Sequence, residues 1–519
     1  MRRRGALLLL AWLAAPPLAA QEADQPVLLR RVLVNGNTVL PAARLEALTA
    51  PWQGRQASAA DLEMLRQDLT RLYTDSGYIN SGVGQPRLDP DGVLEFDVQM
   101  GRLTELRLRG LERLDQRYVR QRLAGAPDAP LNLNLLRERF QLLLADPLFA
   151  RMNARLIPGV RQGEAIFDVE VQRARPFQLR AFANNYRPLA IGANVLGLAG
   201  VLRNLSGQGD LLDASVQGPL GGGHGTRTAL GWQLPLGQDG SSLVLRSERG
   251  GASVIEEPTR ALDIRSRLGD DELGVSHTVR ETLSGKLSAG ASLVWRANRT
   301  SLLGQPYSFV PGEPNGDTRE RLWRFWIDAA WRSSGQVLAA RSSVSAGRNN
   351  LQRIDGLPAQ LVPAQHFWLW QGQWQYGRQL LDNGAQLLLR GAAQYSPQHL
   401  LALDALAVGG VSSVRGFREN QLVRDRGAYL TLECDYPLLG QGPGAPTLML
   451  MPFLDAGQAR NVGAAPEHLA SLGLAGRLEW RGASIELAWA RRLTRPVSAA
   501  VPGASLQDRG IHLQLAYTF

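Results

Sequence analysis

The chain ends, at residues 511–519, with the sequence Ile-His-Leu-Gln-Leu-Ala-Tyr-Thr-Phe. Apolar and polar side chains alternate strictly along it: Ile511, Leu513, Leu515, Tyr517 and Phe519 against His512, Gln514, Ala516 and Thr518. Successive side chains of a β-strand point to opposite faces, so this alternation predicts one face in an apolar medium and one in water. Tyr517 and Phe519 are aromatic residues within the strand itself, and we interpret them as a terminal barrel signature.

The same alternation recurs upstream, and helical spacing disappears from about Phe177 onward. One predicted strand face carries Trp323, Phe325, Ile327, Ala329 and Trp331, opposite Arg324, Asp328 and Arg332, with Trp326 as an exception. Another face carries Trp368, Trp370, Gly372, Trp374 and Tyr376. A third runs through Leu478, Trp480, Ile485, Leu487 and Trp489 across a kink at Arg481-Gly482.

Two closures of such strands are possible. A soluble β-sandwich or propeller would bury the apolar face against another sheet, whereas a transmembrane barrel would turn it to lipid. The frequent Trp and Tyr residues and the strand lengths favour the membrane. At roughly 20 to 22 residues per strand and connection, residues 175–519 predict a barrel of about 16 antiparallel strands around an aqueous lumen.

Before the barrel, two copies of one small α+β unit are predicted, at residues 27–101 and 102–174. Each has the order β-α-α-β-β. In the first copy we expect strand 28–34, helices 41–48 and 61–73, and hairpin strands 83–88 and 93–98; in the second, strand 103–109, a longer helix 131–144, and hairpin strands 154–157 and 165–171. These are either generic modules or modules whose edge strands accept an extended peptide by β-augmentation.

The N-terminus predicts export. Residues 1–20 combine three arginines, a short apolar run and a small-residue end, which is typical of a signal peptide cut after Ala20. The net charge of +10 is spread along the chain, which argues against nucleic acid as a partner. The single cysteine, Cys434, excludes an internal disulfide framework and a Cys-rich metal site.

No catalytic pattern is present in the sequence. The 6 histidines are scattered without the i, i+4 spacing of a metal site. Gly285-Lys286 lacks the upstream glycine of a phosphate-binding loop, and a Gly-x-Ser-x-Gly elbow is missing. We read Gly221-Gly222-Gly223 as a tight barrel turn. We therefore expect no enzyme activity, no catalytic residue, no metal and no cofactor.

Two motifs stand out within the barrel region. Val414, Arg415, Gly416 and Phe417 lie in a long polar connection, and Phe453, Asp455 and Gly457 lie on a later strand. Taken singly, they are an ordinary exposed arginine and an ordinary aspartate at a strand end. Taken together, with a large lumen to fill, they suggest a loop folded inward that pairs Arg415 with Asp455, because guanidinium and carboxylate can bond bidentately. Gly416 would let the loop tip turn tightly.

This arrangement resembles the superfamily of outer-membrane barrels with POTRA units that includes BamA and the TpsB proteins. Within it, the chain is most similar to the TpsB transporters of two-partner secretion, the haemolysin secretion and activation proteins. The early barrel segments Asn184-Asn185-Tyr186 and Leu205–Asp210 also resemble that family. The resemblance implies a pore of 16 strands that exports one large exoprotein, recognised by POTRA units, with the Arg-Gly-Phe tip inside the barrel and Arg415 paired with Asp455.

The expected location is the outer membrane of a Gram-negative bacterium, with the POTRA-like units in the periplasm. The expected partners are a TpsA-like exoprotein at the POTRA edge strands, outer-membrane lipid and the barrel assembly machinery. The driving force would be folding of the substrate outside rather than nucleotide hydrolysis. The rivals are a BamA-like assembly factor and a passive porin or receptor. Few residues separate Gln21 from the first predicted strand, so we expect no plug helix.

Overall fold

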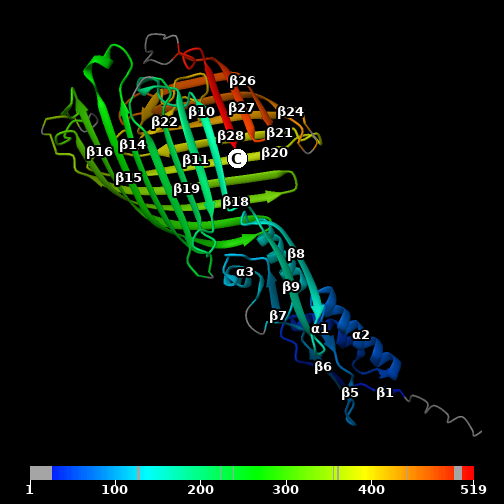
Figure 1. Cartoon of the computed structure of the whole chain (residues 1–519). Helices are drawn as coiled ribbons and strands as arrows, with labels where there is room; N and C mark the ends of the chain where they lie inside the picture. The colour runs from blue at the N-terminus through cyan, green and yellow to red at the C-terminus, as the bar shows by residue number, and fades with distance from the viewer. Residues whose placement is uncertain are drawn as a thin grey trace, which may run out of the picture. The chain divides into compact units, whose positions relative to one another are not determined.

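The structure is a computed structural model that describes residues 26–125, 129–221, 224–237, 239–354, 356–358, 362–440, 442, 444–495 and 505–519. The predicted signal peptide, residues 1–20, lies outside the described residues. Two α+β modules precede a β-barrel along the chain (Figure 1). In the described part of the chain, helices are too short or too polar to cross a membrane.

The first module confirms the predicted β-α-α-β-β order. Its elements are β1 (Val27–Leu28), β2 (Arg31–Asn35), α1 (Ala42–Thr49), the 3-10 turn η1 (Ala50–Trp52), β3 (Gln56–Ala57), α2 (Ala59–Asp75), β4 (Gly82–Val83), β5 (Arg87–Leu88) and β6 (Val93–Gln99). Strand β6 pairs in parallel with β2 and antiparallel with β4 and β5. The single strand predicted at 83–88 is wrong: Pro86 has no N–H for the ladder, and the segment divides into β4 and β5 around it.

Helix α2 begins earlier than the predicted 61–73 because Ser58 caps it. The backbone N–H of Asp61 donates to the Ser58 hydroxyl at 3.3 Å, and the backbone N–H of Ser58 donates to the Asp61 carboxylate at 2.9 Å. This reciprocal capping box satisfies two amides at the helix start. The backbone hydrogen bond from Ser58, followed by the one from its hydroxyl, lowers the pKa of Asp61.

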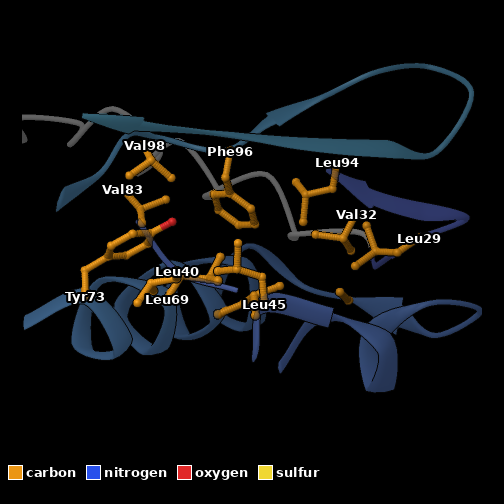
Figure 2. Packing of buried hydrophobic residues seen from close by; sticks show 12 residues of the cluster. Leu29, Val32, Leu40, Leu45, Leu69, Tyr73, Val83, Leu94, Phe96 and Val98 are labelled. Atoms are coloured by element: carbon orange, nitrogen blue, oxygen red, sulfur yellow. The ribbon is translucent and has the colours of Figure 1, made fainter. Parts of the chain in front are cut away.

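The module core lies between α2 and the sheet (Figure 2). Leu94, Phe96 and Val98 alternate along β6 and are buried, as period two requires. They pack against α2, on which Leu69 and Tyr73 lie on the inner face. The Tyr73 hydroxyl donates to the Asn37 side-chain oxygen at 3.0 Å, and burial raises the pKa of Tyr73 to about 12.

The second module has the same order of elements. They are β7 (Arg102–Arg109), α3 (Gln116–Leu123), α4 (Leu133–Leu144), β8 (Phe149–Pro158) and β9 (Glu164–Arg173), with sheet order β7-β9-β8. The chain divides into two compact units, and this module is shared between them: residues 124–137 and 154–169 belong with the chain up to Arg107, whereas 108–123 and 138–153 belong with residues 170–519. The predicted domain boundaries at 101 and 174 therefore stay predictions.

The remaining strands close into an antiparallel barrel, which confirms the predicted fold class. Sixteen strands form it: β10 (Phe177–Asn184), β11 (Val195–Arg203), β12 (Leu211–Pro219), β13 (Arg227–Pro235), β14 (Ser241–Ser253), β15 (Arg265–Thr282), β16 (Gly285–Leu302), β18 (Asp317–Ser333), β19 (Gln336–Asn349), β20 (His366–Gln379), β21 (Gln386–Tyr395), β24 (Arg426–Leu439), β25 (Thr447–Arg460), β26 (Glu467–Trp480), β27 (Ala483–Arg492) and β28 (Ile511–Thr518). The two-residue β17 (Gln305–Pro306) extends the pairing of β16. Strands β10 and β28 close the ring (Figure 1). Across this seam Asn184 lies opposite Gln514.

The alternating faces of β18 lie as predicted. Trp323, Phe325 and Ile327 point outward with exposed fractions of 55%, 56% and 54%. Trp326, the apparent exception, lies on the inner face, where it lines a cavity with Asp328 and has the Arg341 guanidinium 6.0 Å from its ring centre. An aromatic ring on the water-facing side is tolerated here because it packs against a cation.

The kink predicted at Arg481-Gly482 is a hairpin turn. Both residues have positive φ, at 46° and 86°, and Trp480 pairs directly with Ala483 across the turn. This is the two-residue turn whose twist matches antiparallel strands. The segment from 478 to 489 therefore forms two strands, β26 and β27, rather than one bent strand.

The two ends of the barrel differ in their connections. We call the end where β10 begins the near end and the opposite end the far end. Near-end connections are short and include 204–210, 236–240, 283–284 and 334–335. Far-end connections are longer and include 303–316, 350–365, 396–425 and 493–510. Short turns at one end and long loops at the other are typical of outer-membrane barrels.

Candidate functional site

The connection 396–425, between β21 and β24, folds against the inner wall of the barrel; we call it the lumen loop. It contains the antiparallel pair β22 (Leu406–Val408) and β23 (Leu422–Arg424). Four of its apolar side chains, Val408, Val414, Phe417 and Leu422, are buried and pack against Ala459 of β25 and Leu469 of β26. A hydrophobic contact of this kind fixes the loop to the wall rather than leaving it in solvent.

Arg415 lies within this loop and is bonded to Asp455 of β25. Its Nε and Nη2 donate to the Asp455 carboxylate at 2.8 and 3.0 Å, and its backbone N–H donates to the same carboxylate at 3.0 Å. Arg415 is 4% exposed and Asp455 is fully buried. The structure thus brings together two residues that the sequence analysis singled out, in the bidentate geometry that carboxylate and guanidinium favour.

Two further side chains of the wall complete the surroundings of Arg415. Its Nη1 donates to Glu433 of β24, and its guanidinium carbon lies 3.3 Å from the ring centre of Phe453. The predicted motif residue Phe453 therefore serves as a stacking surface for the cation. Glu433 was missed by the sequence analysis, although its position was readable: Thr431, Glu433 and Asp435 alternate with Leu430, Leu432 and Cys434 on β24.

Gly416 allows the loop tip to approach the wall. Its φ is +88°, and a Cβ at this position would lie 2.9 Å from the Cβ of Ala490. The Gly416 N–H donates to Nε2 of His512 at 3.2 Å, and Arg492 donates to the Gly416 carbonyl at 2.5 Å. The tip is therefore held by β27 and β28 as well as by β25.

Gly457 and Phe417 both belong to the contact between the lumen loop and β25. A Cβ on Gly457 would lie 2.8 Å from Val408 and 3.1 Å from Val414, so the bare backbone of β25 leaves room for the loop. Phe417 is fully buried in the apolar cluster, with the Arg492 guanidinium 5.3 Å from its ring centre. All members of the Val414-Arg415-Gly416-Phe417 motif thus contact the barrel wall or its partners.

Ion pairs extend from the loop to other parts of the barrel. Arg418 donates to Asp508 at 2.6 Å and to Glu256 at 2.8 Å, which joins the lumen loop to two other far-end connections. Asp404 accepts from Arg296 of β16 at 2.6 Å, and Arg296 also donates to Asp270 of β15 at 2.6 Å. The loop is therefore anchored on both sides of the lumen.

The base of the loop is fixed by Asp425. Its carboxylate accepts from the His399 ring at 2.9 Å and from the backbone N–H groups of Leu400 and Val462 at 2.8 Å each. Burial opposes ionisation here, but these hydrogen bonds together lower the pKa of Asp425 below its usual range. A carboxylate bonded on several sides holds both ends of the connection in place.

The predicted C-terminal signature lies at the seam of the barrel. Tyr517 pairs with Ala181 of β10 and Ala483 of β27, and the Phe519 N–H donates to the Leu179 carbonyl at 2.9 Å. The two rings meet edge to face, with centroids 4.8 Å apart, on the outward side. Among the described residues, no three His, Cys, Asp or Glu side chains are grouped to hold a metal ion.

Comparison with known proteins gives two family matches. The model of the haemolysin secretion/activation protein ShlB/FhaC/HecB matches residues 163–478, and the ShlB-type POTRA domain matches residues 27–101. The chain is 25% identical over 471 residues to the outer membrane transporter CdiB of Dickeya dadantii (strain 3937), covering 85% of this chain and 79% of that protein. It is 29% identical over 218 residues to the hemolysin transporter protein ShlB of Serratia marcescens, covering 41% of this chain and 37% of that protein.

The fold is that of a solved relative. CdiB from Escherichia coli aligns with a TM-score of 0.75 at 21% identity, covering 97% of this chain and 93% of that one. The predicted POTRA-bearing outer-membrane barrel of TpsB type is confirmed, and so is its location in the outer membrane. Because the family model spans more than half of its length, the chain belongs to the haemolysin secretion/activation protein family ShlB/FhaC/HecB.

Proposed function

We propose that this protein is the pore through which one exoprotein, recognised in the periplasm by the POTRA units, reaches the cell surface in two-partner secretion. The observation that supports this most directly is the lumen loop, which is anchored inside a 16-stranded barrel by the Arg415–Asp455 pair. A loop held in the lumen by a buried ion pair narrows the pore at rest. A pore that must stay closed at rest and open for a substrate needs such an element.

The inner wall away from the loop suits an unfolded chain. It presents polar side chains such as Gln371 and Gln373 around a cavity of about 470 Å³. It also carries two ion pairs: Arg341 donates to Asp328 at 2.6 Å and Arg324 donates to Glu272 at 3.4 Å. A lining of this kind offers hydrogen bonds to a passing backbone without a strong field of one sign.

Docking in the periplasm would use the edge strands of the two modules. In the second module β8 lies at one edge of the sheet order β7-β9-β8 and is ten residues long. An edge strand carries unpaired N–H and C=O groups, which can bind an extended peptide with little demand on its sequence. The first module offers β2 as a shorter edge.

A photo-crosslinking residue at Asn153, exposed on β8, tests this docking role. We expect a crosslink to the exoprotein encoded beside this gene when both are expressed. The matched control places the photo-crosslinking residue at Gln67, which is exposed on the outer face of α2, and should give no crosslink. Crosslinking that is equal at both positions, or confined to Gln67, would overturn recognition through β8.

Transport would proceed without nucleotide hydrolysis, driven by folding of the exoprotein outside. The one Gly-Lys pair in the sequence, Gly285-Lys286, lies at the β15–β16 hairpin, where the Lys286 ammonium donates to Glu281 at 3.0 Å. That is a surface ion pair of a tight turn, not a cradle for phosphates. We further propose that the signal peptide at 1–20 directs export and that the assembly machinery for barrels recognises the terminal strand with Tyr517 and Phe519.

The rival assignment is an assembly factor for other outer-membrane barrels. Depletion of this protein separates the two functions. Loss of one exoprotein from the medium, with unchanged amounts of other outer-membrane barrels, supports secretion. A general loss of outer-membrane barrels would support the rival instead.

A further inference from the structure

Two arginines lie side by side on the outer surface of the barrel. Arg321 of β18 and Arg348 of β19 are direct cross-strand partners, and both are exposed. The same row continues to Trp295 of β16, which pairs with Arg321, and to His366 of β20, which pairs with Arg348. We call these four residues the rim row.

The two arginines are not neutralised by the protein. Among the described residues, no carboxylate forms an ion pair with Arg321 or Arg348. Two other outward arginines are paired: Arg265 donates to Asp263 and Arg249 to Asp271, both at 2.8 Å. Like charges directly opposite each other destabilise a sheet, so this pair is a repulsive contact in the isolated chain. An anion bound between the guanidinium groups would remove the repulsion.

The rim row lies at a defined depth in the membrane. The next outward row toward the middle of the barrel contains Trp323, Ala346 and Trp368, again as direct partners. Tryptophans of this kind mark the boundary between hydrocarbon and headgroups. The arginines therefore lie just beyond that boundary, at headgroup level. They lie toward the far end, because β18 begins there after the connection 303–316.

The surface is hollowed at this place. A groove of about 1250 Å³ is lined by the four rim-row residues together with Trp323 and Trp368. The edge toward the far end carries the cations Arg321 and Arg348, and the edge toward the middle of the barrel carries the aromatic rings of Trp323 and Trp368. A ligand that matches both edges has an anionic head and apolar chains.

We propose that the rim row binds the phosphate group of an outer-leaflet glycolipid, with Arg321 and Arg348 on the phosphate and the acyl chains along Trp323 and Trp368. The far end of the barrel faces the outside of the cell, because the near end follows the periplasmic modules in the chain. The outer leaflet there carries phosphorylated lipid A. Guanidinium groups match phosphate oxygens bidentately, and two of them can share one phosphate.

The test uses the full-length protein in detergent and native mass spectrometry with diphosphoryl lipid A as the probe. We expect the double variant Arg321→Gln/Arg348→Gln to bind it about tenfold or more weakly, because charge-assisted contacts are lost. The matched control is Arg249→Gln/Arg265→Gln, which removes the same charge from arginines that already have carboxylate partners. This control should bind as the unaltered protein does.

The proposal would be overturned if the unaltered protein and the rim-row variant bound lipid A equally, or if the control lost as much binding as the variant. It would also be overturned if the unaltered protein retained zwitterionic phosphatidylethanolamine as well as lipid A. The unfolding temperature, measured with and without lipid A, gives a second test, because it also reports the repulsion between the two arginines. Without lipid A, the rim-row variant should unfold at the same or a higher temperature than the unaltered protein, because the repulsion is gone. With lipid A, only the unaltered protein and the control should gain stability. If inorganic phosphate stabilises the protein as much as lipid A does, the assignment to lipid is wrong.

Discussion

The Arg415 side chain and the Asp455 carboxylate are joined by two hydrogen bonds of 2.8 and 3.0 Å, and a backbone N–H of the same arginine bonds the same carboxylate. The residues belong to the lumen loop and to β25, so this contact fixes the loop to the wall. Both are buried, and neither charge is solvated. Their removal therefore has unequal consequences, which can be predicted from the charges left behind.

Replacing Arg415 should be more damaging than replacing Asp455. Arg415→Ala leaves Asp455 buried without a cation and Glu433 with Arg390 alone, at 3.9 Å, whereas Asp455→Asn leaves Arg415 bonded to Glu433. Breaking a buried pair by removing one partner costs about 3–5 kcal/mol. We expect Arg415→Ala to abolish secretion and to alter single-channel conductance in planar bilayers, and Asp455→Asn to reduce secretion only in part. Arg265→Ala, at an exposed pair, is the control. Equal effects of the two variants would contradict this reasoning.

Gly416→Ala should weaken loop anchoring without changing any charge. The left-handed conformation costs alanine about 1–2 kcal/mol, and its Cβ would lie 2.9 Å from that of Ala490. We expect lower secretion and more frequent opening events in bilayer recordings. Gly377→Ala serves as the control, since nothing lies within 4 Å of a Cβ there. Unchanged conductance of the Gly416 variant would show that the tight turn is dispensable.

The contact between Asp404 and Arg296 should restrain the lumen loop independently of the Arg415–Asp455 pair. Asp404→Asn removes the negative charge from the 2.6 Å contact with Arg296, which retains Asp270. Hydrogen bonds to charged groups contribute about 1.5–3 kcal/mol, so the loop should detach on one side while the barrel stays folded. Bilayer recordings should show larger current fluctuations than with Asp263→Asn, a surface variant. Fluctuations equal to those of the surface variant would argue that Asp404 does not restrain the loop.

The first turn of α2 should lose protection in acid. The hydrogen bonds from Ser58 lower the pKa of Asp61, so its stabilising contribution is fully present above the unfolded pKa of about 3.9 and is lost as the pH falls through the lower folded value. Hydrogen exchange of residues 59–65, corrected for intrinsic rates, should show this loss in the unaltered protein and not in Asp61→Asn. Asp68→Asn, whose partner Arg71 is exposed, should behave as the unaltered protein does.

The sequence predicted the strands well because lipid and water impose a strict period of two. Phe325 and Ile327 lie outward for that reason, and Trp326 violates the pattern only through its local contact with Arg341. The strand at 83–88 was predicted as continuous because Val83 and Leu88 frame a short segment ahead of a turn, yet the missing N–H of Pro86 divides it. Helix α2 begins at Ala59 rather than at the predicted residue 61 because of the Ser58 capping bonds, which the spacing of apolar residues does not reveal.

The anchors of the lumen loop were predicted only where a motif marked them. Arg415 and Asp455 stood out because a cation in a loop and an anion on a strand had a lumen between them. The contact of Asp404 with Arg296 joins residues 108 positions apart, and it exists only because barrel closure brings β16 next to the loop. Pairings set by closure leave no local pattern, so strand order had to be known first.

Passage of the exoprotein through the lumen is tested most directly by crosslinking at two adjacent positions of β20. Gln371 faces the lumen and Trp370 faces outward. A photo-crosslinking residue is placed at each position, with the exoprotein fused to a tightly folded domain that stalls it in transit. We predict a crosslink to the stalled exoprotein from position 371 and none from position 370. Crosslinks from neither position, or equally from both, would contradict transport through this barrel.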